Sequence, residues 1–183
     1  MFDAKLLADL ITVVRAMAGM WIAWLGLTRN EEALPVVALV MILCWTGDFV
    51  DGTLAHRSRH PRHTWVGDRD VNVDAFVSLC LAVYMIGAGH FNLLVGGAYL
   101  FGWTIVFLFA GNDRNLLMLA QTPIYLTFTL IVLQISPERG YLMVAWVATA
   151  LAINWRRFSA DMVPKFIDHM RSLWDGHSKP HHS

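Results

Sequence analysis

The chain has 183 residues, of which 56% are hydrophobic and only 15% are charged, and its formal net charge at pH 7 is zero. A typical soluble domain carries about 25% charged residues, so this composition argues against a water-soluble enzyme and favours a chain that lies in a bilayer. The balanced charge excludes a general electrostatic attraction to nucleic acid, and no nucleic-acid partner is expected.

Six apolar stretches follow one another along the chain, each close to the length of about 20 residues that a helix needs to cross a bilayer. They cover residues 9–28, 34–55, 70–90, 93–111, 115–135 and 140–156. The first stretch is not read as a cleaved signal peptide, because Asp9 and Arg15 interrupt it and it continues well past Arg15. The sequence therefore predicts an all-α fold, a polytopic membrane protein whose six transmembrane helices form one bundle over residues 1–158.

Residues 159–183 are expected to form a separate cytoplasmic tail. Apolar residues recur at helical spacing between positions 159 and 176, with the charges between them. This pattern favours an amphipathic helix on the membrane surface. The alternative is a frayed polar tail, and the last residues, 178–183, are read as disordered.

Lysine and arginine are distributed unevenly between the two sides of the expected bundle. Six spans place both termini on the same side. If that side is the cytoplasm, eleven Lys and Arg residues face inward and two, Arg29 and Arg139, face outward. Because basic loops stay inside, the sequence predicts an integral protein of the bacterial inner membrane with both termini cytoplasmic.

Four aspartates stand at the cytoplasmic ends of the second and third expected spans. Asp48 and Asp51 are three residues apart and Asp70 and Asp74 four apart, so each pair lies on one face of its helix. Placing a carboxylate at a membrane boundary costs free energy, and four carboxylates close together need cations to neutralise their charge. Mg²⁺ and Mn²⁺ prefer carboxylate oxygens, and two such ions would clamp a diphosphate. The alternative is a set of ordinary helix-end charges facing water.

The sequence around these aspartates resembles the signature of the CDP-alcohol phosphotransferase (CDP-alcohol phosphatidyltransferase) family. That signature reads Asp-x-x-Asp-Gly-x-x-Ala-Arg, then a spacer, then Gly-x-x-x-Asp-x-x-x-Asp. It is matched by Asp48, Asp51, Gly52, Ala55, Asp70 and Asp74. The six spans and the early segment Leu-Ile-Thr-Val-Val-Arg15 also look like the family, so the resemblance covers roughly residues 5–158.

The chain departs from the family signature at two points. His56, followed by Arg57, stands where the family has arginine. The spacer is one residue longer than usual, so Gly67 lies nearer to Asp70 than the signature glycine does. One inserted loop residue explains both departures if Arg57 takes the place of the family's arginine.

The resemblance implies a transferase of phospholipid biosynthesis. Such an enzyme moves a phosphoryl-alcohol (phosphatidyl) group from a CDP-alcohol, such as CDP-diacylglycerol, to an acceptor hydroxyl and releases CMP. By resemblance, Asp48, Asp51, Asp70 and Asp74 hold two Mg²⁺ or Mn²⁺ ions, and Asp74 is also the catalytic base. The nucleotide is expected at Asp48, Asp51, Gly52, Ala55, Arg57 and Gly67. The expected partners are a CDP-linked lipid donor, an acceptor alcohol, membrane lipids and a second copy of the chain in a homodimer.

Several residues outside the signature invite either a functional or a packing interpretation. Arg15 lies inside the first apolar run and either binds a phosphate or lipid, or snorkels to the inner surface. Arg114 either helps to bind a phosphate or lipid, such as a phosphorylated acceptor, or belongs to the positive charge expected on the inner side. Gly96, Gly97 and Gly102 are expected to permit close helix packing rather than to bind a ligand.

Two other functions are compatible with the sequence. The first is a catalytically silent relative that binds nucleotide, lipid or metal in a membrane assembly, and the altered segment Ala55-His56-Arg57 motivates it. The second is a small transporter with an acidic cation site, but no second acidic pair lies across the bundle. No motif identifies the acceptor alcohol.

Overall fold

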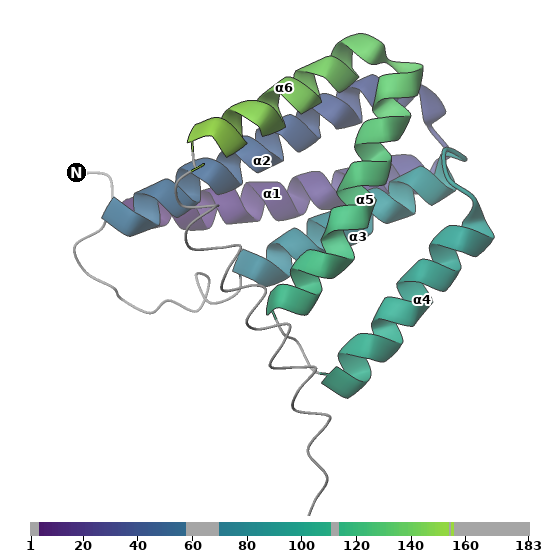
Figure 1. Ribbon diagram of the computed structural model, residues 1–183, viewed down its shortest axis with the longest axis horizontal. Helices are drawn as coiled ribbons and strands as arrows, with labels where there is room; N and C mark the ends of the chain where they lie inside the picture. The colour runs from purple at the N-terminus through teal and green to yellow at the C-terminus, as the bar shows by residue number, and fades with distance from the viewer. Residues whose placement is uncertain (1–3, 58–69, 111–113, 154, 156–183) are drawn as a thin grey trace, which may run out of the picture. The chain divides into compact units, whose positions relative to one another are not determined.

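The computed structural model describes residues 4–57, 70–110, 114–153 and 155. These residues form six α-helices and one short 3-10 helix and contain no β-strand, which confirms the expected all-α class (Figure 1). The elements are α1 (Ala4–Leu27), η1 (Glu31–Ala33), α2 (Leu34–Arg57), α3 (Asp70–Gly87), α4 (Leu93–Ala110), α5 (Arg114–Ile135) and α6 (Pro137–Ile153).

The chain divides into two compact units, Met1–Val144 and Ala145–Ser183. The first unit contains α1 to α5 and the beginning of α6, and the core and candidate site described below belong to it. The amphipathic helix expected over residues 159–176 lies outside the described residues.

Three helical stretches are long and apolar enough to cross a membrane: Leu10–Leu27, Glu31–Phe49 and Asn115–Ile135. The apolar parts of α3 and α4, Val73–Gly87 and Leu93–Phe109, are shorter. Large apolar side chains are widely exposed on these helices, and they reach 88% exposure at Phe109. Soluble monomers rarely expose contiguous apolar surface on this scale, so the surface is of the kind that contacts lipid. The number of six spans stays a prediction.

Two of the described connections are short polar turns that fix where the next helix begins. Between α1 and α2, Arg29 adopts a positive φ of 53°, and the Asn30 side chain accepts a hydrogen bond from the Ala33 backbone N–H at 3.1 Å. Between α3 and α4, Gly89 has a φ of 78°, a conformation that glycine adopts at no steric cost. The Asn92 side chain then caps α4 by accepting from the backbone N–H groups of Leu94 and Val95.

The helices α1 and α3 run parallel and contact each other along much of their length. Gly19 lies beside Val77, and Gly26 lies beside Tyr84 and Gly87, so the offset between the two sequences stays nearly constant. A Cβ atom on Gly26 would come within 2.5 Å of the Tyr84 Cα atom. Glycine therefore allows the two backbones to touch, as in other membrane helix pairs.

The buried core lies around this contact and includes side chains of α2 and α5. Its largest fully buried members are Tyr84, Phe128, Ile22, Leu34, Met41, Leu81, Met143, Val37 and Val132. The helix α5 packs against α3, with lesser contact to α2, whereas α4 packs mainly against α3.

The expectation that three glycines of α4 permit close packing is confirmed for Gly96. A Cβ atom there would come within 2.6 Å of the Ile86 side chain. It is wrong for Gly97 and Gly102, because a Cβ atom on either one would have no described neighbour within 4 Å.

Candidate functional site

Three charged side chains from three helices meet at one point in the first unit. Arg15 of α1 donates from Nη1 to Asp48 Oδ1 on α2 at 3.1 Å and from Nη2 to Asp74 Oδ1 on α3. The two aspartates are 26 positions apart in sequence, and each belongs to a different pair of the acidic pattern. One guanidinium therefore joins the first member of the first acidic pair to the last member of the second pair.

The packing of the three helices explains this convergence. The constant offset between α1 and α3 that pairs Gly19 with Val77 also brings Arg15 level with Asp74. On α2, Gly47 precedes Asp48, and a Cβ atom on Gly47 would lie 3.1 Å from Ile11 Cγ2 and 3.6 Å from Arg15 Cδ. The missing side chain lets α2 approach the aliphatic stem of Arg15 closely, which places Asp48 within reach of the guanidinium.

The electrostatics of the site are asymmetric. The side chain of Arg15 is 6% exposed, whereas those of Asp48 and Asp74 are 46% and 28% exposed. The positive charge thus lies beneath two carboxylates that face outward. Among the side chains that the structure describes here, one guanidinium faces two carboxylates, so these three groups together carry a formal charge of −1 (+1 − 2). A site of that charge attracts a further cation.

Two aromatic side chains adjoin the charged residues. The Tyr125 hydroxyl on α5 donates to the backbone carbonyl of Asp74 at 3.4 Å. Trp45 of α2 meets the Tyr125 ring edge to face, with centroids 5.6 Å apart and an interplanar angle of 90°. This arrangement of aromatic pairs is favourable. It ties α5 to both helices that carry the acidic pattern.

The other residues expected at the site are placed only by their backbone. Asp51, Gly52, Ala55 and Arg57 lie in the last turns of α2. Asp70 is the first residue of α3, and Arg114 is the first residue of α5. Gly67 lies outside the described residues. Asp51 is one turn beyond Asp48, and Asp70 is one turn before Asp74, so the backbone continues both pairs toward the same end of the bundle.

Sequence reasoning singled out Arg15 but missed its partners. A phosphate contact and snorkelling were both considered, whereas the structure gives Arg15 two carboxylates. Gly47, Trp45 and Tyr125 were missed altogether. A buried arginine in a span needs carboxylate partners at a similar depth in the membrane. The signal that could have identified Asp74 is therefore its position in the third expected span, at a depth similar to that of Arg15 in the first.

The donor chemistry of the site suits a hard divalent cation, since its described acidic ligands are carboxylate oxygens. The geometry leaves less room for a cation at these carboxylates, because Arg15 already contacts an oxygen of each one. Among the residues that the structure describes, no group of three or more His, Cys, Asp or Glu side chains is arranged to hold a metal ion. A complete metal site would need the side chains of Asp51 and Asp70 as well.

Comparison of the chain with protein-family models, with curated proteins and with solved structures gave no match.

Proposed function

We propose that this chain is an integral membrane CDP-alcohol phosphotransferase that transfers a phosphatidyl-type group from a CDP-linked lipid to an acceptor hydroxyl and releases CMP. The observation that carries the proposal is the meeting of Asp48 and Asp74 on Arg15. The acidic pattern requires its two halves to act at one place, and the helices bring one carboxylate of each half to a single point. Helix-end carboxylates that only faced water would not share one buried guanidinium in this way.

The wider arrangement that we propose follows the lysine and arginine distribution. Six helices cross the bacterial inner membrane and both termini are cytoplasmic. The homodimer is proposed from the family resemblance alone. The acidic site then lies at the cytoplasmic surface, where a CDP-linked lipid presents its nucleotide to water and keeps its chains in the bilayer. The exposed apolar surface and the three helices of sufficient length support a membrane location.

In the proposed reaction, the acceptor hydroxyl oxygen forms a bond to the phosphorus that carries the lipid alcohol. The bond from that phosphorus to the bridging oxygen breaks, and CMP leaves with the electron pair. Asp74 accepts the hydroxyl proton, a role that requires hydrogen-bond reach to the acceptor. Arg15 and Tyr125 act as positioning residues, since they contact the side chain and the backbone of Asp74, respectively.

Divalent cations, when bound by Asp48, Asp51, Asp70 and Asp74, would supply the charge stabilisation that a departing nucleotide needs. Gly52, Ala55, Arg57 and Gly67 would then line the nucleotide site. Arg15 would remain beneath the carboxylates and hold Asp48 and Asp74 in position.

The test is CMP release from CDP-diacylglycerol by the purified chain with Mg²⁺ or Mn²⁺, across a panel of acceptor alcohols. Replacing Asp74→Asn should lower turnover by about 10²- to 10⁴-fold, the usual contribution of a general base. The matched control is Glu31→Gln, which removes an exposed carboxylate in η1 and should leave turnover unchanged. Size-exclusion profiles establish that both variants fold. Full activity of the Asp74→Asn variant would refute the assigned base.

A catalytically silent relative that binds nucleotide, lipid or metal is the second candidate, and one observation favours it. Arg15 provides a resident positive charge between two carboxylates that an active site would give to a metal. Mn²⁺ and cytidine nucleotide binding, measured by calorimetry beside the CMP assay, separates the candidates. Binding without CMP release from any CDP-linked donor selects the silent relative, whereas release of CMP excludes it.

A further inference from the structure

The helix α5 carries a proline in its interior, and this residue interrupts the backbone hydrogen bonds of the helix. Pro123 has no N–H group to donate to the carbonyl of Leu119, four residues earlier. The pyrrolidine ring would also clash with that carbonyl in a straight helix, so the axis bends away from the ring. The helix therefore has two halves, residues 114–122 and residues 124–135, that are joined by one backbone hydrogen bond fewer than in a regular helix.

Hydroxyl groups contact the carbonyls on either side of Leu119 in the sequence. The Thr122 hydroxyl donates to the carbonyl of Met118 at 2.8 Å, and the Tyr99 hydroxyl of α4 donates to the carbonyl of Ala120 at 2.7 Å. Membrane helices tolerate an interior proline where neighbouring groups satisfy the backbone in this way. The hydrogen bond from Tyr99 comes from another helix, so it also holds the first half of α5 against α4.

The second half of α5 is fixed in the core. Phe128 and Val132 are fully buried, and the Tyr125 ring meets Trp45 of α2 edge to face. The Tyr125 hydroxyl also donates to the backbone carbonyl of Asp74 on α3 at 3.4 Å. These contacts join the second half to two neighbouring helices, so it cannot move without disrupting the core.

The first half of α5 borders open space instead. Leu117, Ala120 and Gln121 line a cavity of about 330 Å³ between α3, α4 and α5. Among the described residues, α4 and α5 make little direct contact with each other. A close-packed interior resists the displacement of a helix, whereas a cavity on one side lets a helical segment shift without overlapping its neighbours. The two halves of α5 therefore differ in how firmly the surrounding helices hold them.

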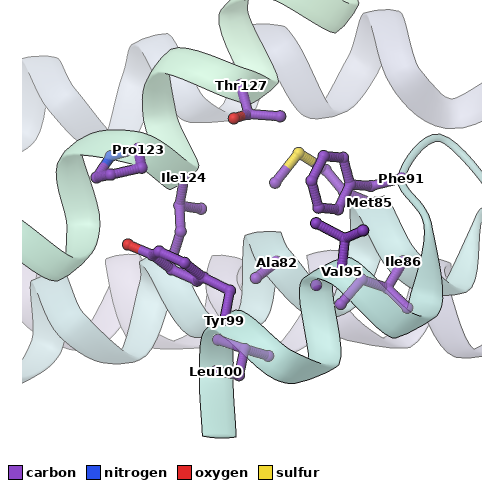
Figure 2. A pocket seen from close by; sticks show the side chains of 11 residues that line it. Ala82, Met85, Ile86, Phe91, Val95, Tyr99, Leu100, Pro123, Ile124 and Thr127 are labelled. Carbon is purple, nitrogen blue, oxygen red and sulfur yellow. The ribbon is translucent and has the colours of Figure 1, made fainter. Parts of the chain in front are cut away.

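The proline ring lies on the side of α5 that faces α4. Pro123 lines a smaller cavity of about 90 Å³ together with Tyr99 and Val95 of α4. Figure 2 shows Pro123 and the Tyr99 hydroxyl on one side of this cavity, with Val95 and Phe91 on the other. Because a helix bends away from its proline ring, the first half can move away from α4. The hydrogen bond from Tyr99 to Ala120 opposes that movement.

We propose that Pro123 is a hinge about which residues 114–122 swing away from α4, and that the Tyr99 hydroxyl is the latch that holds them in the observed position. The larger cavity widens in this movement, and its lining includes Ala75, the residue that follows Asp74. The swing therefore opens the acidic site on the side of α4. This last step rests on the proposed function, whereas the hinge itself does not.

Distances between two nitroxide labels, measured by pulsed EPR on the full-length protein in detergent, test the hinge. One label is attached at Met20→Cys on α1, which packs closely on α3. The other is attached at Met118→Cys in the first half of α5 or, as the matched control, at Leu130→Cys in the second half, and all three positions are exposed. The native cysteines are buried, so the labels go to the introduced ones. The pair with Met118→Cys should give two distances and the pair with Leu130→Cys one.

Two further substitutions identify the hinge and the latch. Pro123→Ala restores the missing N–H group and should leave the Met118→Cys pair with a single distance. Tyr99→Phe removes the latch and should raise the ratio of the second population to the first by about two- to tenfold, the contribution of one net hydrogen bond. A purely structural role of Tyr99 would lower stability without changing this ratio.

Each other outcome overturns the proposal. A single distance for the Met118→Cys pair, in the wild-type background and with Tyr99→Phe, would show that the first half does not swing. Two distances for the Leu130→Cys pair would mean that α5 moves as a whole, and two distances that persist with Pro123→Ala would place the flexibility elsewhere. Neither donor nor acceptor is present, so the result is independent of catalysis. CMP release by a protein without the swing would refute the hinge alone, and a swing without CMP release would refute the phosphotransferase alone.

Discussion

The helices α1 and α4 both contact α3, but they do so in opposite ways. At the α1–α3 contact, Gly26 and Gly87 let the two backbones touch, and a side chain on either one would overlap the main chain of the other helix. Gly97 and Gly102 of α4, in contrast, have no described neighbour within the same range. Close to its beginning α4 meets Ile86 at Gly96, and further along it lines a cavity of about 330 Å³ with α3 and α5.

The difference separates a close backbone contact from an open one. Lipid is as apolar as leucine, so helices in a bilayer associate through close packing and hydrogen bonds rather than through the hydrophobic effect. The α1–α3 contact has both kinds of interaction, because the glycine crossing lies near one end and the Arg15–Asp74 ion pair lies further along. The helix α4 has few such contacts, which leaves space beside α3. The close α1–α3 contact thus positions the acidic site, and the open side of α4 leaves cavities beside α3.

The largest effect is expected at the glycine crossing. Replacing Gly26→Ala places a Cβ atom within 2.5 Å of Tyr84 Cα and 2.9 Å of the Val83 carbonyl oxygen, both of them backbone atoms that cannot move alone. The two helices must separate, and we expect a loss of about 3 kcal/mol or more, at the upper end of overpacking effects. Unfolding by SDS titration in mixed micelles measures it. Unchanged stability would show that α1 and α3 are not in backbone contact.

The comparison also shows what could be read from the sequence. The lengths of the apolar runs and the positions of turn residues predict the helix bounds to within a few residues, because helix bounds depend mostly on local sequence. The second span, for example, was expected at 34–55 and is observed as Leu34–Arg57. The convergence of the two acidic pairs is predicted by their three- and four-residue spacing on neighbouring helices, and the structure brings together one member of each pair, Asp48 and Asp74.

Partners between distant helices could not be predicted in this way. A glycine in an apolar run looks the same whether it faces a backbone, as Gly26 does, or open space, as Gly97 does. Only the offset between α1 and α3 distinguishes them, and that offset is a property of the packed pair. The same offset determines that Arg15 meets Asp74, which explains why its carboxylate partners were missed.

The next largest effect is expected at the ion pairs. Replacing Arg15→Leu leaves the carboxylates of Asp48 and Asp74 facing each other without their shared cation. Loss of one partner from a buried pair costs about 3–5 kcal/mol, and the partial exposure of both carboxylates reduces this to about 1–3 kcal/mol. Adding Asp48→Asn and Asp74→Asn to the Arg15→Leu variant should recover part of the loss. The same SDS titration applies, with Arg139→Leu as the control, and no loss in the single variant would contradict the bridging role.

A smaller effect is expected where α4 is joined to α5. The Tyr99 hydroxyl donates to the Ala120 carbonyl at 2.7 Å. Tyr99 also lines the two cavities between α3, α4 and α5. Replacing Tyr99→Phe should cost about 0.5–1.5 kcal/mol, the net value of one hydrogen bond. Hydrogen exchange should accelerate in α4 and not in α1, because the bond joins α4 to α5 and does not involve α1. Tyr141→Phe, at an exposed position of α6, is the control, and equal acceleration in α1 and α4 would argue against a separately mobile α4.

The smallest effect, with the opposite sign, is expected at Gly97. A Cβ atom there meets no described neighbour within 4 Å, so Gly97→Ala should stabilise α4 by up to about 1 kcal/mol through the higher helix propensity of alanine. The substitutions Gly26→Ala and Gly97→Ala make the same chemical change, one at a close contact and one in open space. Changes of opposite sign in the free energy of unfolding, measured by the same SDS titration, would confirm that the two glycines differ in this way. A loss at Gly97 would mean that another surface covers this face. If that loss also depended on protein concentration, the covering surface would belong to a second copy of the chain, because only association makes stability depend on concentration.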